Sequence, residues 1–185
     1  YETGRPRLAL LPGDLRLAGA DSELARARDP EKRLSAVLSP VRRSYDVIVI
    51  DGPPGLTLLP RMALYASGAY VVPTHAHELS VEALARFFEG VEQFKGRLRR
   101  ATQLLGIVLT MVDRRTRMTE EIVSQVRRKY GSKVFRTEIP INVRLAEAPR
   151  YAGSILDYES WSSGGQAYRM LGAEVLRRAR AQGLL

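Results

Sequence analysis

The sequence predicts an α/β fold, a doubly wound and mainly parallel sheet with helices on both faces. Three apolar runs, 47–50, 69–73 and 104–112, have the near-continuous hydrophobic character of strands that are covered on both faces. Longer amphipathic segments follow these runs, with apolar residues at helical spacing. Short strands that alternate with helices of this length are typical of a parallel sheet.

The N-terminal third of the chain adds one strand and two helices to this prediction. Residues 8–11 form a short apolar run that predicts a strand, and residues 20–28 have a helical pattern. A second helix is predicted over 31–43, because Pro30 stands at its first turn, where a proline is well tolerated. The run 47–50 comes next, and each of its residues is apolar and β-branched.

The C-terminal part adds a strand and three helices. A helix is predicted over 81–99 with Ser80 as its N-cap, and another over 119–130 that ends at Gly131. A shorter, partly alternating strand is predicted over 134–139.

The last helix is predicted over 161–181, with its arginines facing outward. Its inward side is expected to consist of Tyr168, Leu171, Val175 and Leu176. The glycine pair Gly164-Gly165 is interpreted as the start of this helix.

Composition limits the class of protein. The 185 residues suit one domain, and 45% hydrophobic with 26% charged residues is ordinary globular composition. The sequence has no cysteine, which excludes disulfides and thiolate metal sites and makes the cytoplasm the expected location. The apolar runs are too short to cross a membrane. The chain starts at Tyr1 rather than at a methionine, so an upstream portion is expected to be missing.

The net charge of +9 points to polyanionic partners, of which nucleic acid is the first candidate. An arginine-rich composition that only keeps the protein soluble explains the same charge equally well. On charge alone both interpretations stay open.

The segment YDVIVIDGPPG carries the clearest chemical signal. It places Asp51 after an apolar run, at the sheet edge where ligands bind in open α/β folds. A carboxylate there can hold Mg²⁺, through its water shell, against nucleotide phosphates. The simpler alternative is an aspartate that caps the helix beginning near Thr57.

A phosphate-binding loop is the partner that such an aspartate needs. Neither GxxxxGK[ST] nor the variant KGGxGK[ST] occurs in the sequence. If Asp51 does face Mg²⁺, it is the magnesium side of a nucleotide site whose phosphate side does not occur in this sequence.

Several stretches together resemble the ParA/Soj family of MinD-like deviant-Walker P-loop ATPases. They are LALLPGDLRLAGADSELA, YDVIVIDGPPGLTLL, GIVLTMVDRRT, VFRTEIPINVRLAEAPRYAGSILDY and SSGGQAY, in the order of the family. The resemblance implies that residues 1–185 are the C-terminal part of a single ATPase domain of the P-loop NTPase type, incomplete at its N-terminal side. It also implies ATP and Mg²⁺ as cofactors and ATP-dependent homodimers. The implied partners are nonspecific DNA and a ParB-like adaptor, during plasmid or chromosome segregation on the nucleoid.

The resemblance assigns roles to five residues. It makes Asp51 the Walker B aspartate that faces Mg²⁺ through water, Asp113 the residue that reads adenine, and Pro140 part of the loop that packs on the base. It places Arg115 and Arg144 at DNA-contacting positions. Each residue has a simpler alternative: Asp113 ends a strand, Pro140 stops one, and the arginines are solvated surface charges.

The neighbouring basic residues favour the DNA assignment over solvated charges. They are Arg114, Arg117, Arg127, Arg128, Lys129 and Arg136. Ile141 departs from the family, which often has a basic residue there, and weakens the DNA case slightly. His75 and His77 have no third ligand at a reliable spacing and are interpreted as ordinary loop residues.

The missing loop determines what the isolated chain is expected to do. In this family the phosphate-loop strand lies between the strands 47–50 and 69–73, so its absence leaves a gap with unpaired backbone groups. Because the lysine and backbone of that loop supply most of the catalysis, no catalytic residue is assigned and the chain is expected not to hydrolyse ATP by itself. Two alternatives remain: a noncatalytic, degenerate ParA-like module that binds DNA or protein, and a MinD-like ATPase that cycles on membranes.

Overall fold

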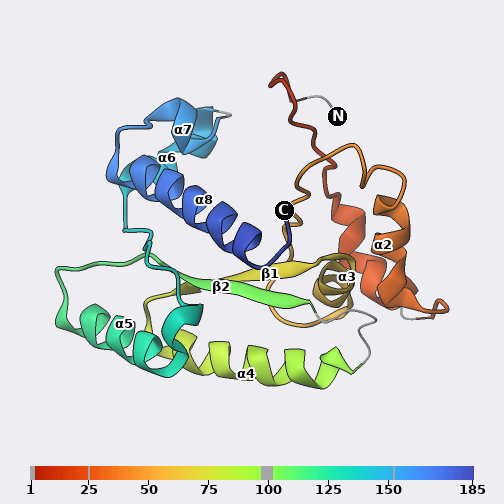
Figure 1. The fold of residues 1–185 in the computed structure, drawn as a ribbon, viewed down its shortest axis with the longest axis horizontal. Helices are drawn as coiled ribbons and strands as arrows, with labels where there is room; N and C mark the ends of the chain where they lie inside the picture. The colour runs from red at the N-terminus through yellow and green to blue at the C-terminus, as the bar shows by residue number, and fades with distance from the viewer. Residues whose placement is uncertain (1–2, 25, 97–101, 152) are drawn as a thin grey trace. The chain divides into compact units, whose positions relative to one another are not determined.

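The computed structural model describes residues 3–24, 26–96, 102–151 and 153–185, in two compact units. Unit 1 is Tyr1–Ala66 and unit 2 is Ser67–Leu185. Figure 1 shows the course of the chain through both.

Unit 1 consists of short helices joined by irregular chain. They are η1 Leu15–Gly19, α1 Ala20–Leu24, η2 Pro30–Lys32, α2 Arg33–Leu38 and α3 Leu58–Ala66. The second predicted helix begins at Pro30, as expected, but ends at Leu38, and turns replace its last part. The first is also shorter than its predicted range.

The predicted strand at 47–50 is not formed. The run has no regular secondary structure, and Val47, Ile48 and Val49 are 50%, 38% and 86% exposed. An apolar run becomes a central strand only when neighbouring strands satisfy its backbone groups and helices cover its faces. Among the residues that the structure describes, no strand pairs with this run. Residues 8–11 form no strand either, and their leucines are exposed.

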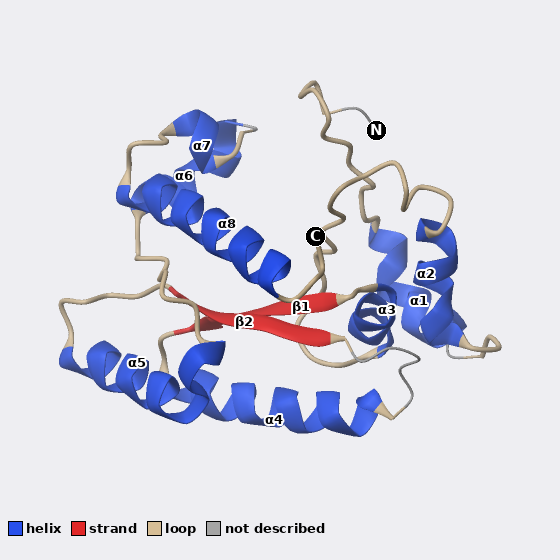
Figure 2. Cartoon of the chain, viewed as in Figure 1, coloured by secondary structure: helices blue, strands red, loops and turns tan. Residues whose placement is uncertain are grey.

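Unit 2 contains the sheet, with β1 Ala69–His75 parallel to β2 Gln103–Thr110 (Figure 2). The register runs from Ala69 opposite Gln103 to His75 opposite Thr110, with an irregularity at Tyr70/Val71. Both strands lie where the sequence predicts them, to within two residues at each end.

The segment 134–140 lies along the other edge of β2. The N–H of Phe135 donates to the Ile107 carbonyl at 2.8 Å, and that of Ile139 donates to the Leu109 carbonyl at 2.9 Å. The predicted strand is thus reduced to isolated parallel bridges, Ile107 with Val134 and Val112 with Pro140. In the described part of the chain, β1 pairs only with β2. The other edge of β1 has no neighbouring strand there, and it is the edge at which the sequence predicts the missing phosphate-loop strand.

Helices cover both faces of these strands, which confirms the doubly wound α/β class (Figures 1 and 2). Helices α4 Glu78–Lys95 and α5 Arg117–Tyr130 lie on one face, and α8 Ser163–Ala181 lies on the other. Two buried clusters fill the two interfaces. One contains Leu84, Ile107, Leu109, Ile122, Val123 and Val126, and the other contains Leu105, Val108, Phe135, Ile139, Ala167 and Ala179.

The helix ends follow local sequence signals. His77, not Ser80, is the N-cap of α4, and the predicted end at Arg99 falls outside the described residues. Thr116 caps α5 by accepting the N–H of Thr119, and Gly131 ends that helix at a φ of 53°, as predicted. After it come η3 Gly131–Lys133, α6 Val143–Glu147, η4 Ala148–Tyr151 and α7 Ile155–Tyr158.

The glycine pair of α8 is at the start of the helix, as expected, and it permits close packing. A Cβ on Gly164 would lie 2.6 Å from Leu145, and one on Gly165 would lie 2.7 Å from the Ser160 carbonyl. Leu171 and Val175 pack against the core, but Tyr168 and Leu176 are 44% and 42% exposed, so their predicted inward position is wrong. Glu174 and Ala179 occupy the buried side of the helix instead.

Candidate nucleotide-binding and DNA-binding residues

Asp113 and Pro140 come together at the carboxyl end of β2. The N–H of Val112 donates to the Ile139 carbonyl at 3.1 Å, and the N–H of Ile141 donates to the Val112 carbonyl at 3.2 Å. These bonds hold the two segments side by side, with Val112 opposite Pro140. This edge of a parallel sheet is the usual place for ligands in open α/β folds.

Met111 gives this edge its shape. It has a φ of 54°, which is uncommon for a residue with a side chain, and it is 53% exposed. The chain leaves β2 here and re-forms a bridge at Val112, so the strand ends at Thr110. Non-glycine residues in this conformation cluster at ligand sites, and nothing in the apolar run 104–112 indicates the turn.

Asp113 is engaged by Arg115. Its Oδ1 accepts the backbone N–H of Arg115 at 3.1 Å and the Nε–H at 2.8 Å, and Oδ2 accepts an Nη2–H at 2.7 Å. The side-chain hydrogen bond from Arg115, followed by its backbone N–H, lowers the pKa of Asp113 to about 2. The side chains of Asp113 and Arg115 are 20% and 84% exposed. The residue predicted to read a base and the residue predicted to contact DNA are therefore bonded to each other.

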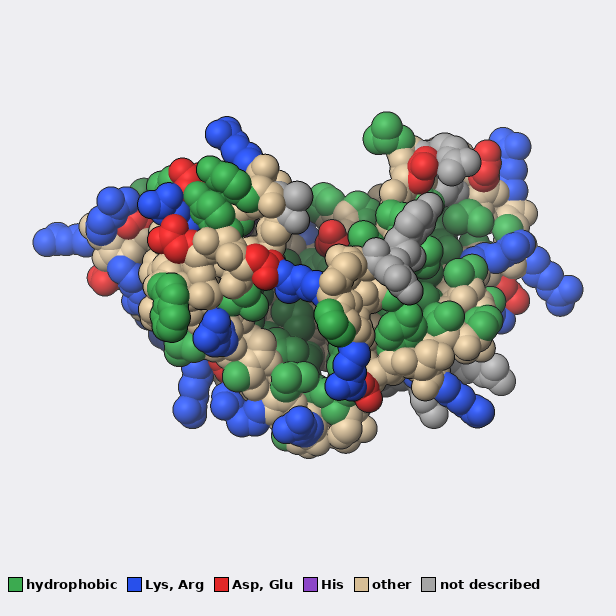
Figure 3. Space-filling model, turned by 90° about the horizontal axis from the view of Figure 1, so that it is seen from above, with side chains coloured by type: hydrophobic (Ala, Val, Ile, Leu, Met, Phe, Trp, Pro, Cys, Tyr) green, Lys and Arg blue, Asp and Glu red, His purple; other side chains and the backbone are tan. Residues whose placement is uncertain are grey.

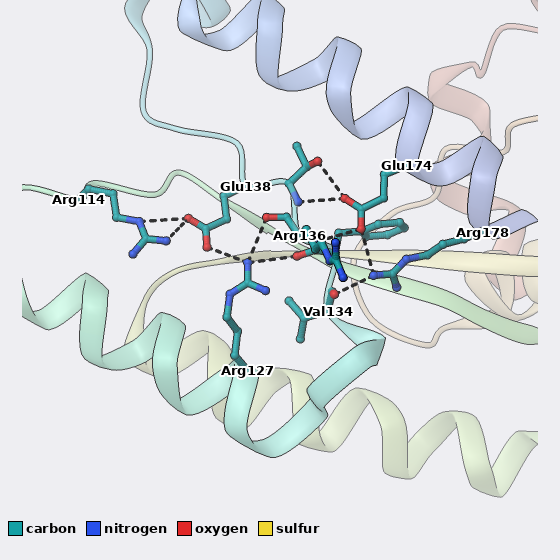
Figure 4. A network of polar contacts seen from close by, with 9 residues as sticks. Arg114, Arg127, Val134, Arg136, Glu138, Glu174 and Arg178 are labelled. Carbon is teal, nitrogen blue, oxygen red and sulfur yellow. Dashed lines mark hydrogen bonds and ion pairs between the residues drawn. The ribbon is translucent and has the colours of Figure 1, made fainter.

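Glu138 gathers two residues of the predicted basic set (Figure 4). It accepts from Arg114 at 2.6 Å and from Arg127 at 2.8 Å, with its side chain 15% exposed. Arg127 also donates to the Phe135 carbonyl at 3.1 Å, so that α5 is tied to the segment 134–140. Arg114 and Arg127 thus support the fold in addition to carrying charge.

Glu174 of α8 is a buried carboxylate that the sequence does not single out (Figure 4). It accepts the backbone N–H groups of Arg136 at 2.9 Å and Thr137 at 3.0 Å, and the Thr137 hydroxyl at 2.9 Å. Burial disfavours its charged form, but these donors and Arg178 outweigh burial, so that the pKa of Glu174 is lower than usual. Glu174 therefore anchors the segment that leads to Pro140.

Arg178 completes this anchor and does not face outward as predicted. It donates to Glu174 at 3.1 Å and to the Val134 carbonyl at 2.8 Å. Its guanidinium lies over the Phe135 ring at 4.2 Å. The spacing of Glu174 and Arg178, one helical turn apart, is the only sequence signal for the pair.

Arg144 lies in α6, and its backbone N–H donates to the side-chain oxygen of the N-cap residue Asn142. Its guanidinium pairs with Glu147 and with Glu159, each at 3.0 Å. Hydrogen bonding to Glu147 is the main cause that raises the pKa of Arg144. In this structure both arginines predicted to contact DNA are held by carboxylates of their own chain.

Asp51 lies in unit 1, in an exposed and irregular segment. The strand predicted to present it is not formed, so the structure does not supply that geometry, and its magnesium role stays a prediction. No group of three or more His, Cys, Asp and Glu side chains in the described residues has the arrangement of a metal site. His75 is the last residue of β1 rather than a loop residue, and His77 occupies the N-cap position of α4 without a side-chain cap hydrogen bond.

Comparison with known proteins identifies the family. A family model described as an AAA domain matches residues 1–104. The chromosome partitioning protein ParA of Caulobacter vibrioides is 35% identical over 181 residues, which are 97% of this chain and 68% of that protein. The chromosome-partitioning ATPase Soj of Thermus thermophilus is 39% identical over 92% of this chain and 67% of its own length. The sporulation initiation inhibitor protein Soj of Bacillus subtilis is 36% identical over 91% and 66%.

Solved structures agree on the fold. A cobyrinic acid a,c-diamide synthase from Mycobacterium smegmatis, with bound ATP analog and magnesium, superposes with a TM-score of 0.76 at 25% identity, covering 93% of this chain and 63% of that one. The cell division ATPase MinD of Pyrococcus furiosus superposes with a TM-score of 0.60 at 20% identity, covering 80% and 58%. On the strength of the sequence relatives, the chain belongs to the ParA/Soj family of chromosome-partitioning ATPases.

Proposed function

We propose that residues 1–185 are the C-terminal part of a single ATPase domain that binds nonspecific DNA during chromosome or plasmid partition. The complete domain would bind ATP and Mg²⁺, form a homodimer with ATP and respond to a ParB-like adaptor on the nucleoid in the cytoplasm. The observation that carries the proposal is the similarity to ParA and Soj proteins over more than nine-tenths of the chain.

The proposal of nucleotide binding rests on Asp113 and Pro140, which lie at the carboxyl end of β2. The Pro140 ring offers an apolar surface for a base, and the Asp113 carboxylate is a hydrogen-bond acceptor suited to the exocyclic amine of adenine. Both lie at the carboxyl end of β2, and Glu174 fixes the segment that carries Pro140. The proposed recognition is therefore of an adenine nucleotide.

The residues present do not form a complete magnesium site. Asp51 contributes one carboxylate, and the described residues contain no cluster of further ligands. Mg²⁺ takes six oxygen ligands and relies on phosphates and waters for several of them. Asp51 is thus proposed only as the carboxylate on the magnesium side, and no catalytic step is assigned to this chain.

The DNA end of the proposal rests on the charge of residues 113–138. This segment contains eight Lys and Arg residues against four Asp and Glu residues. Arg128, Lys129 and Arg136 are exposed on or beside α5. Exposed arginines and lysines of this kind suit phosphate contacts better than base readout. Figure 3 shows that Lys and Arg side chains are also interspersed with acidic and hydrophobic ones on the face seen from above.

The test is binding to labelled duplexes of unrelated sequence over a range of salt. We expect Arg115→Ala and Arg144→Ala each to weaken binding to all duplexes alike, and to reduce the slope of log affinity against log salt by at most about one, according to how fully each arginine contacts a phosphate in the wild type. Arg177→Ala on α8 is the control, because it removes the same charge from an exposed position outside the segments that carry Arg115 and Arg144. Unchanged affinity in both test variants would remove the DNA assignment.

A noncatalytic, degenerate ParA-like module that binds DNA or protein is the second candidate, which the absence of a phosphate-loop motif from the native gene would favour. Both candidates predict no ATP turnover by the isolated chain, so turnover at a rate typical of an ATPase would contradict both. The sequence of the gene upstream of Tyr1 separates them: a KGGxGK[ST] motif there supports the ATPase.

The third candidate is a MinD-like ATPase that cycles on membranes. No helix in the described ranges is both long enough and apolar enough to cross a membrane. A surface-bound amphipathic ending would need apolar residues of α8 free for lipid. Leu171 and Val175 pack against the core, whereas Tyr168 and Leu176 are exposed.

A further inference from the structure

The ion pair between Asp113 and Arg115 connects the residue proposed to bind adenine with a residue proposed to bind DNA. Its proposed role rests on that function. The Asp113 carboxylate and the Arg115 guanidinium each have two possible partners. Arg115 can bond Asp113 or a phosphate, and Asp113 can bond Arg115 or another donor. In the structure they bond each other through two side-chain hydrogen bonds of 2.8 Å and 2.7 Å.

We propose that Asp113 is a built-in restraint on DNA binding, which holds the Arg115 guanidinium away from phosphates until the carboxylate is released or taken by another donor.

The geometry makes the contact easy to exchange. The Arg115 side chain is 84% exposed, so it needs no movement of the fold to reach a phosphate. The two residues are separated by one position and share a turn, because Asp113 also accepts the backbone N–H of Arg115. Opening the ion pair thus leaves the turn intact and changes only the direction of one side chain.

Other arginines of the same segment are held differently. Arg127 donates to Glu138 and to two backbone carbonyls, so its guanidinium is part of the fold. Arg114 bonds Glu138, whose side chain is only 15% exposed. Within the described part of the chain, the Arg115 guanidinium bonds Asp113 alone, in the loop that adjoins the proposed base site. Arg115 is therefore the arginine whose charge a change at that site can release.

Adenine is the donor that the proposed function supplies. Its exocyclic amine and the guanidinium of Arg115 would compete for the same carboxylate oxygens, since each oxygen accepts along limited directions. Occupation of Asp113 by a base would therefore free Arg115 for DNA.

The test uses Asp113→Asn in the whole chain. The amide oxygen of asparagine can still accept the backbone N–H of Arg115 and keep the turn, but the charge that holds the guanidinium is gone. Binding of a fluorescein-labelled duplex of random sequence is measured by anisotropy over a range of salt. We expect affinity to rise roughly two- to fivefold, as suits the removal of one exposed ion pair. The salt slope should steepen by less than about one, because a restraint of this size leaves Arg115 partly available in the wild type.

Two controls isolate the restraint. Glu120→Gln removes one exposed negative charge from α5, and we expect a smaller rise with no change of slope. In an Arg115→Ala background, Asp113→Asn should act like Glu120→Gln, because no guanidinium is left to release. The Nε–H signal of Arg115 in NMR spectra, sharp and shifted while bonded, should move to the averaged arginine position in Asp113→Asn without any DNA.

The outcomes separate the two proposals. If the wild-type chain binds DNA but Asp113→Asn behaves like Glu120→Gln, the restraint is wrong and the proposed function stands. If only Asp113→Asn binds DNA, the restraint is supported in its strongest form. If neither binds, both are wrong, whereas an unshifted Arg115 signal in the variant refutes the restraint alone.

Discussion

Two carboxylate–guanidinium pairs in unit 2 have the same chemical groups in opposite surroundings. Glu174 and Arg178 have side chains that are 5% and 20% exposed, against 20% and 84% for Asp113 and Arg115. Glu174 also satisfies the N–H groups of Arg136 and Thr137, so other parts of the fold depend on it. The bonds of Asp113 stay within its own turn.

This difference shows that the role of an ion pair depends on its burial and on the other hydrogen bonds that its two side chains make. Losing one partner of a buried pair leaves an uncompensated charge and unsatisfied donors, which is costly. Losing one partner of an exposed pair exchanges it for water at little cost. We therefore assign Glu174 and Arg178 to the stability of the base-site segment, and Asp113 and Arg115 to exchangeable recognition.

The largest expected effect comes from breaking the buried pair. Glu174→Ala should lower the free energy of unfolding by about 3 kcal/mol, because two backbone N–H groups, a hydroxyl and Arg178 lose their acceptor. Urea denaturation followed by far-UV circular dichroism measures this change.

The control for that experiment is Glu82→Ala on α4. Glu82 pairs with Arg86 one turn away at 2.9 Å, with both side chains at least 70% exposed. We expect a loss of less than about 0.5 kcal/mol. Equal losses in the two variants would mean that Glu174 is not an anchor.

A smaller effect is expected from crowding the buried pair instead of removing it. A Cβ at Gly106 of β2 would lie 2.5 Å from the Phe135 ring and 2.8 Å from the Arg178 Nη1 atom. Gly106→Ala should therefore displace the ring and the guanidinium, at a cost of roughly 1–3 kcal/mol. Gly172→Ala on α8, where a Cβ meets nothing within 4 Å, is the matched control and should be neutral or slightly stabilising.

The sequence predicts the two strands that lie near these ion pairs well. The runs at β1 and β2 form strands because each finds a parallel neighbour and helices on its faces. The run 47–50 has a purer strand pattern than either, and stays exposed. An apolar, β-branched pattern thus shows that a segment can form a buried strand. Whether the strand forms depends on adjacent strands that pair with it and on helices that cover it.

The candidate site is predicted in part. Asp113, Pro140, Arg115 and Arg144 are identified through the family resemblance, but their mutual bonds are not. Glu138 and Glu174 escape notice because a glutamate on a predicted strand or helix resembles any surface acid. Burial of Glu174 follows from donors 37 and 38 residues away in the chain, which no local pattern contains.

The smallest and most specific effect is the response of the two pairs to acid. Both carboxylates have a lowered pKa, and a group of this kind stabilises the fold above its unfolded pKa and loses that contribution as pH falls through its folded pKa. For Asp113 the window therefore runs from 3.8 down to about 2. For Glu174 it starts at the ordinary value of 4.5 and extends below it.

Salt separates the two contributions within these windows. Ions screen the exposed pair strongly and the buried pair weakly. The stability difference between wild type and Glu174→Gln should shrink as the pH falls below 4.5, at low and at high salt alike. The difference between wild type and Asp113→Asn should be small at neutral pH, fade between 3.8 and about 2, and become smaller still at high salt. Urea midpoints across this pH range, at both salt levels, measure both differences. Equal salt sensitivity of the two would contradict the division into a structural pair and an exchangeable one, because that division rests on the difference in their access to water.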